Sequence, residues 1–173
     1  LPLCFSATAE GGSASLWQKF IPLTISFLFI LLTSICAQDS CRLRISLLTC
    51  TPGDELYAIF GHSALRVTDS VSNTDVVYNY GTFNFAEPGF YTKFIRGKLP
   101  YYLSTEDPNE FMSSYQQQGR GVTEQVLNLT CTETKKLTLL LAENLLPQNR
   151  EYRYDFLFDN CTTRLRDLVE KVA

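Results

Sequence analysis

Cys161 is the residue in this sequence whose setting is most suited to nucleophilic chemistry. It lies in the stretch FDNCTTRLRDL, and the apolar residues that follow it have the spacing of one face of a helix. Asp159 or Asn160 then occupies the N-cap position of that helix. A cysteine in a first helical turn lies near unpaired backbone N–H groups and the positive end of the helix dipole, and both favour the thiolate. Cys161 is therefore a candidate nucleophile.

A base for this thiol is available in His62, the only histidine of the chain. Gly61 precedes it and permits a sharp turn before a predicted strand. A thiol–imidazole pair is what nucleophilic acyl chemistry requires, because imidazole both accepts the proton and returns it. If HSALRV and VVYNYGTF form a hairpin, residues 79–81 lie opposite His62. We expect Asn79 to orient the ring by accepting its second N–H, with Tyr80 as the alternative.

Two arginines near these blocks are expected to support the site rather than perform chemistry. A guanidinium group keeps its proton in a protein, so Arg66 and Arg164 can pair with a carboxylate or phosphate but cannot act as the base. Arg66 shares a strand face with His62 if the strand is regular. Asp155 or Glu55 is its expected partner.

The elements that must position these residues follow from hydrophobic periodicity and turn signals. Strands are predicted over residues 41–50, 62–69, 75–83, 99–105, 121–130 and 151–158. Helices are predicted over residues 54–60, 87–98, 107–119 and 130–146 and from about residue 161. The pattern indicates an α+β fold, with a mainly antiparallel sheet and helices packed on it.

Residues 19–40, KFIPLTISFLFILLTSICAQDS, have the pattern of a secretory signal peptide: a positive charge, an apolar run and small residues before cleavage after Ala37. We therefore assign residues 1–37 to an upstream segment and signal peptide, and residues 38–173 to one domain. We expect this domain to be exported, to the periplasm or the outer face of the cytoplasmic membrane. Because the sequence stops inside a helix without a C-cap, we also expect the natural protein to continue.

Export makes disulfides the main structural alternative for the cysteines, since four of them remain in the predicted domain. Two disulfides would use all four of these cysteines, including Cys161, and leave no free thiol. A single bridge would join Cys131 to either Cys41 or Cys50. The 173 residues carry a net charge of −3 with scattered Lys and Arg, so nucleic acid is not an expected partner. No motif predicts a metal ion or a cofactor.

Four blocks carry a resemblance to a known family: LLTCTPGDELYAIFGHSALRV, VVYNYGTFNF, GKLPYYL and YRYDFLFDNCTTRLRDL. In this order they resemble a group of bacterial envelope proteins, long labelled a domain of unknown function, that includes the lipoprotein N-acylation transferases. The resemblance covers residues 42–172, and GHxxxR and DNCTTR are its specific parts. His62, Asn160, Cys161 and Arg164 match these two parts, whereas Asn79 matches only the YNYG block. A histidine before a helix-opening cysteine is also similar to the circularly permuted papain-like superfamily that contains lecithin:retinol acyltransferase.

The resemblance implies a cysteine-dependent acyltransferase. Cys161 would take an acyl chain from the diacylglyceryl group of a lipoprotein as a thioester, and the α-amine of the lipoprotein would then accept it. Lipid-modified proteins or membrane lipid are the implied partners, and the stretches FNFAEPGFYTKF and LPYYL line a lipid groove, touch the membrane or form sheet core. Two other functions stay open: a papain-like amidase or peptidase of the cell wall, and a non-catalytic, disulfide-stapled envelope module. A mature chain without a free cysteine would exclude an enzyme of this kind.

Overall fold

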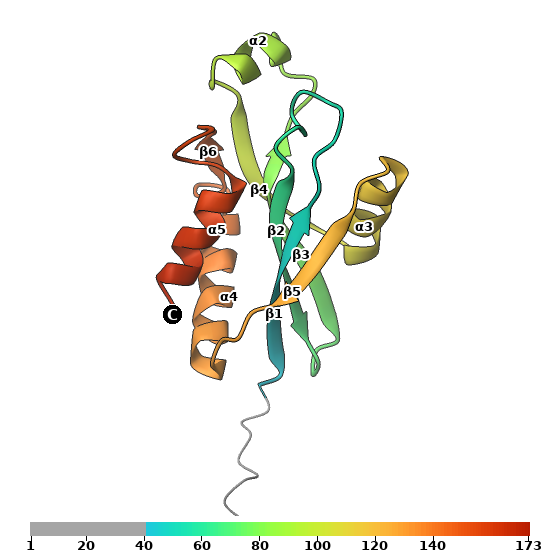
Figure 1. Ribbon diagram of the computed structural model, residues 1–173. Coiled ribbons are helices and arrows are strands. Elements are labelled where there is room, and N and C mark those ends of the chain that lie inside the picture. The colour runs from blue at the N-terminus through green and yellow to red at the C-terminus, as the bar shows by residue number, and fades with distance from the viewer. Residues whose placement is uncertain (1–40) are drawn as a thin grey trace, which may run out of the picture. The chain divides into compact units, whose positions relative to one another are not determined.

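A six-stranded sheet, antiparallel at every pairing, runs through the computed structural model, which describes residues 41–173 of the chain (Figure 1). Its order is β5-β1-β2-β3-β4-β6. The strands are β1 (Leu43–Cys50), β2 (His62–Asp69), β3 (Thr74–Phe83), β4 (Pro100–Glu106), β5 (Val122–Val126) and β6 (Glu151–Arg153). The helices are α2 (Phe90–Ile95), α3 (Pro108–Gln117), α4 (Cys131–Leu145) and α5 (Cys161–Glu170). The predicted α+β fold class with a mainly antiparallel sheet is confirmed.

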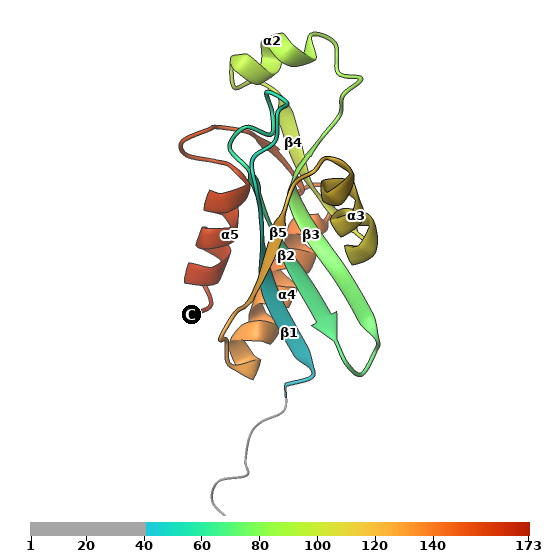
Figure 2. The same ribbon diagram turned by 45° about the vertical axis from the view of Figure 1, so that its right-hand side comes forward.

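Helices cover both faces of the sheet. α4 and α5 lie on one face and α3 on the other, and α2 lies at the end of the sheet away from the C-terminus (Figures 1 and 2). Because successive residues of a strand point to opposite faces, the central strand β2 contributes to two cores. Leu65 packs with Leu137 and Leu165 of α4 and α5, whereas Ala64 packs with Phe111 of α3.

Local capping explains where the helices begin. Asp107 caps α3 by accepting the N–H groups of Asn109 and Glu110, at 2.8 and 3.2 Å. The Thr130 hydroxyl and the Glu133 carboxylate form a reciprocal capping box at the start of α4. The predicted helices over residues 107–119 and 130–146 are therefore confirmed. The helix predicted over 87–98 is also present, as the shorter α2.

Three predicted elements differ from the structure. Residues 54–60 form consecutive turns instead of a short helix, and these turns are closed by hydrogen bonds from Gly53 N–H and Gly61 N–H to the Ala58 carbonyl, both 3.0 Å long. The strand predicted over 151–158 ends at Arg153, because the Asp155 side chain accepts the N–H groups of the residues two and three positions later and holds a turn instead. β5 likewise ends at residue 126 rather than 130.

A disulfide joins Cys41 to Cys131, across 90 residues of sequence. It links the chain just before β1 to the first residue of α4, so the first of the two predicted pairings is correct and the pairing with Cys50 is wrong. Cys50 and Cys161 are both free. The predicted signal peptide and its cleavage site at Ala37 lie outside the described residues. Within residues 41–173, no helix is both long enough and apolar enough to cross a membrane.

Candidate active site

Cys161 is the first residue of α5, and the cap of this helix fixes its position. Asn160 is the N-cap residue: its side chain accepts the Thr163 N–H at 3.0 Å, and the Thr163 hydroxyl accepts the Asn160 N–H at 2.8 Å. The Thr162 hydroxyl donates to the Ser63 hydroxyl of β2 at 3.2 Å, which ties the first turn of α5 to the strand that begins with His62. The thiol and the imidazole are thus brought together from residues 99 positions apart.

The His62 ring is held by Asn79 of β3, with 2.8 Å between His62 Nε2 and Asn79 Oδ1. The Asn79 amide has a defined orientation because Oδ1 also accepts the Gly81 N–H at 2.7 Å and Nδ2 donates to a Glu106 carboxylate oxygen. An oxygen that faces Nε2 requires that Nε2 carries the proton in the neutral ring. The basic nitrogen is therefore Nδ1, the one left for the thiol.

Gly81 gives the His62 ring its place. β3 and β4 change register between Asn79 and Thr82, where a bulge interrupts the ladder. A Cβ atom at Gly81 would come within 2.3 Å of His62 Cε1 and 2.9 Å of Nδ1, so the imidazole rests directly on the glycine backbone. Any side chain at this position would occupy the space of the ring.

The Cys161 thiol is set up to ionise near neutral pH. Burial raises its pKa, but the hydrogen bond and charge of His62, together with a hydrogen bond from the Ser63 backbone, outweigh burial and lower the pKa from 9.0 to about 7. Cys50, the other free thiol among residues 41–173, behaves in the opposite way. Burial raises its pKa to about 11, although a hydrogen bond with Tyr115 acts against the increase. Of the two thiols, Cys161 is thus the one with the larger thiolate fraction at neutral pH.

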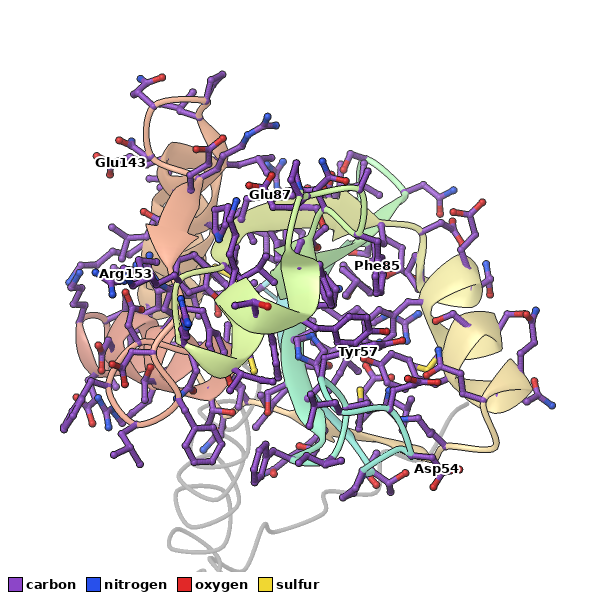
Figure 3. All side chains as sticks on the ribbon, turned by 90° about the horizontal axis from the view of Figure 1, so that it is seen from above. Asp54, Tyr57, Phe85, Glu87, Glu143 and Arg153 are labelled. Carbon is purple, nitrogen blue, oxygen red and sulfur yellow. A yellow bond between two sulfur atoms is a disulfide. The ribbon has the colours of Figure 1, made fainter. Side chains whose placement is uncertain are left out.

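Two cavities meet at Cys161 and His62. The first, of about 290 Å³, extends toward α3, and its lining includes the aromatic residues Tyr57, Phe83, Phe85, Tyr101 and Tyr154. Tyr57 and Phe85 lie close together at this end of the molecule, with ring centroids 5.3 Å apart (Figure 3). The second cavity, of about 340 Å³, lies on the side of Phe60, Phe156 and the first turn of α5. Aromatic side chains therefore line both approaches to the sulfur.

Comparison with known proteins assigns the chain to a family. The family model described as the Lnb N-terminal periplasmic domain matches residues 37–173. The chain belongs to this family. No curated protein and no solved structure matches the chain. The Lnb-family domain is periplasmic by this membership, in agreement with the localisation predicted from the sequence, and its disulfide is consistent with export.

In this Lnb-family domain, Arg66 is engaged away from the two cavities. It makes a two-point ion pair with Asp75 of β3, at 2.8 and 2.6 Å, and a third contact of 2.9 Å with Glu124 of β5. The expected partners Asp155 and Glu55 are wrong. Asp155 belongs to the turn after β6, at the far edge of the sheet from β5, and Glu55 is exposed in the turns over residues 54–60. Arg66 cross-links three strands.

Arg164 holds the turn that precedes Cys161. Its guanidinium group contacts both carboxylate oxygens of Asp159, at 2.6 and 2.8 Å, and lies 3.9 Å from the centre of the Tyr152 ring. Tyr80, the alternative partner considered for His62, is buried and does not reach the imidazole. Its hydroxyl accepts a hydrogen bond from Asn144 of α4, on the face of the sheet that α4 and α5 cover. Of the two alternatives, Asn79 is the one that contacts His62.

Sequence reasoning missed two residues that complete the arrangement. Glu106, the last residue of β4, fixes the Asn79 amide, and Arg120 lines the first cavity. Glu106 lies one residue beyond the strand predicted over 99–105. The sequence signal that could have identified Glu106 is its place as a charged residue at the end of a strand that pairs with β3. Arg120 follows a glycine turn after α3, and no local pattern marked it.

Proposed function

We propose that this Lnb-family domain is a cysteine-dependent acyltransferase of the bacterial envelope. In this proposal it moves an acyl chain from the diacylglyceryl group of a lipoprotein to the α-amine of the lipoprotein. The observation that supports it most is the Cys161–His62–Asn79 arrangement, with an ionisable thiol at a helix start between two cavities that have aromatic side chains in their walls. The order of histidine before a helix-opening cysteine is also that of the permuted papain-like enzymes.

The first half-reaction forms a thioester. His62 Nδ1 accepts the Cys161 proton, and the sulfur attacks the ester carbonyl carbon. The Cys161 backbone N–H, which has no helical acceptor at the first position of α5, is available to the developing oxyanion. When the tetrahedral intermediate collapses, the carbon–oxygen ester bond breaks and the imidazolium gives its proton to the departing glyceryl oxygen. The acyl group is then bonded to Cys161.

The second half-reaction transfers the acyl group to nitrogen. The neutral α-amine attacks the thioester carbonyl, His62 accepts a proton from the amine nitrogen, and the thiolate leaves. The products are an amide on the lipoprotein and a free hydroxyl where the ester was. Asn79 contributes by keeping Nε2 as the donor throughout, so that Nδ1 faces the sulfur in both steps.

Exposed apolar side chains next to the second cavity support a lipid partner. They come from two neighbouring turns and are Leu56, Ile59, Phe60, Phe156, Leu157 and Phe158, each between 41% and 80% exposed. The two turns touch, since the rings of Phe60 and Phe156 are 4.3 Å apart. Three consecutive exposed apolar residues are unusual on a soluble surface and suit contact with acyl chains or a membrane.

The test is to incubate the membrane-reconstituted protein with a diacylated lipoprotein and to search the Cys161 peptide for a hydroxylamine-sensitive acyl mass. We expect the adduct in the wild type and in Cys50→Ala, the matched control in which the other free thiol is removed. Cys161→Ser should show neither the adduct nor N-acylated lipoprotein. Acyl transfer that persists in Cys161→Ala would contradict the proposal, and release of free fatty acid without N-acylation would identify a hydrolase instead.

A further inference from the structure

Arg120 lies in the wall of the first cavity and has no carboxylate partner in the described part of the chain. It lines this cavity together with Cys161 and His62. Within the described residues, no carboxylate oxygen lies within 4.0 Å of its guanidinium group, whereas Arg66 and Arg164 each have one or more. Its Nη2 atom is buried and has no hydrogen-bond partner in the same part of the chain.

The guanidinium group is held in place by neutral contacts. Nε donates to the Thr51 carbonyl at 2.9 Å, Nη1 donates to the Gln118 side chain at 3.1 Å, and the guanidinium carbon lies 4.5 Å from the centre of the Tyr115 ring. The stem is also confined, because a Cβ atom at Gly53 would come within 2.9 Å of Arg120 Cδ. The contacts thus fix the position of the Arg120 guanidinium group. Within the described residues, its charge has no anionic partner and its Nη2 atom has no hydrogen-bond acceptor.

An unpaired cation in a partly buried wall is costly unless something compensates it. Glu106, which lines the same cavity, is bonded to Asn79 and is not within ion-pair distance of Arg120. A planar guanidinium with a free N–H is the group that recognises the oxygens of phosphate or carboxylate. A ligand with an anionic group in this cavity would compensate the charge of Arg120.

We propose that Arg120 forms an anion subsite, which binds a phosphate or carboxylate oxygen of the molecule whose carbonyl group reacts with Cys161. The subsite selects acyl donors that carry a negative charge near the reacting carbonyl carbon. The two groups must be close enough to fit together in the first cavity, of about 290 Å³. This inference rests on the proposed nucleophilic role of Cys161. Its test needs no acyl transfer, so the two proposals can fail separately.

The test compares alkylation of Cys161 by anionic iodoacetate and by neutral iodoacetamide in the full chain, quantified on the Cys161 peptide. In each reaction the sulfur forms a bond to the methylene carbon and iodide leaves. We expect the iodoacetate-to-iodoacetamide rate ratio to fall about tenfold in Arg120→Gln, the size of one charge-assisted hydrogen bond. Arg96→Gln is the matched control, since it removes an exposed arginine outside the cavity and should leave the ratio unchanged.

A second arm uses the wild type alone and so does not depend on the folding of the variant. Inorganic phosphate and acetate, each compared with chloride at equal ionic strength, should slow the iodoacetate reaction, and the stronger competitor identifies the preferred oxyanion. The proposal is overturned if neither anion protects Cys161, or if folded Arg120→Gln keeps the wild-type ratio. A ratio that falls equally in both arginine variants would also overturn it, because that result reflects overall charge.

Discussion

Burial and hydrogen bonding compete at the Cys161 sulfur, and His62 decides the outcome. Burial alone favours the neutral thiol, as Cys50 shows with its pKa of about 11, but the imidazole brings the Cys161 pKa down to about 7. Both thiols are buried, and their pKa values differ because the contacts of Cys161 with His62 outweigh burial, whereas the Tyr115 hydrogen bond to Cys50 does not.

This difference predicts a pH profile for alkylation of Cys161 by iodoacetamide. Because the pKa is lowered to about 7, the rate should rise as pH increases through 7 and level off above it, where the thiolate predominates. In His62→Ala the burial remains and the hydrogen bond is lost, so the pKa should rise and the rate at pH 7 should fall. Cys50 in the same sample should stay unmodified and serve as the control. A rise at the same pH in both proteins would contradict this account.

The partners of His62 and Arg66 show what sequence could predict at the scale of single residues. The His62–Asn79 contact was predictable because the two residues lie on consecutive strands joined by a short connection. The Arg66 partners were not, because Glu124 belongs to β5, 58 residues away, and its position depends on how β5 pairs with β1. A contact that depends on which distant strands are neighbours in the sheet cannot be predicted from local hydrophobic periodicity.

Among the elements, the bulge in β3 has the most direct effect on the site. Gly81 lies in this bulge and its φ angle is not positive, so it is needed for space rather than for an unusual backbone conformation. Gly81→Ala should therefore leave the backbone unstrained but displace the His62 ring. We expect the rate of Cys161 alkylation at pH 7 to fall toward that of His62→Ala, with the near-UV and far-UV circular dichroism spectra retained.

Gly121→Ala is the matched control for this substitution. Gly121 is also a glycine without a positive φ, but its nearest neighbour, Thr51 Cγ2, is 3.4 Å from the position of the new Cβ, which is ordinary contact. Its alkylation profile should equal that of the wild type. A Gly81→Ala protein with a wild-type profile would show that the imidazole does not depend on this glycine.

The regular elements were more predictable than the turns between them. A short polar side chain directly before a helical pattern of apolar residues is typical of an N-cap. Asp107, Thr130 and Asn160 therefore indicate where their helices begin. The turn after β6 was misread as strand, since its apolar residues alternate in a strand-like way. There the backbone N–H groups of Leu157 and Phe158 bond to the Asp155 side chain instead of pairing with a neighbouring strand. The apolar side chains of this turn are exposed to solvent.

At the scale of the whole molecule, the Cys41–Cys131 disulfide is the one covalent cross-link, besides the backbone itself, in residues 41–173. It closes a long loop, so its removal should enlarge the unfolded ensemble and lower the free energy of unfolding by about 2–4 kcal/mol. Urea unfolding of the wild type and of a Cys41→Ala, Cys131→Ala double variant measures this difference. The alkylation rate of Cys161 in native buffer should not change, because neither cysteine lines the cavities at the site. Equal stability of the two proteins, or a loss of Cys161 reactivity in the folded variant, would contradict this prediction.

The position of Cys161 between two cavities has a kinetic consequence. In the proposed reaction, the deacylated glyceryl group can stay on the side of Tyr57 while the α-amine of the same lipoprotein approaches the thioester from the side of Phe60. The lipoprotein then need not dissociate between the two half-reactions. When a lipoprotein with isotope-labelled acyl chains is mixed with an unlabelled lipoprotein of different peptide mass, the labelled N-acyl chain should stay on the lipoprotein that supplied it, and labelled chains on the other lipoprotein would contradict this.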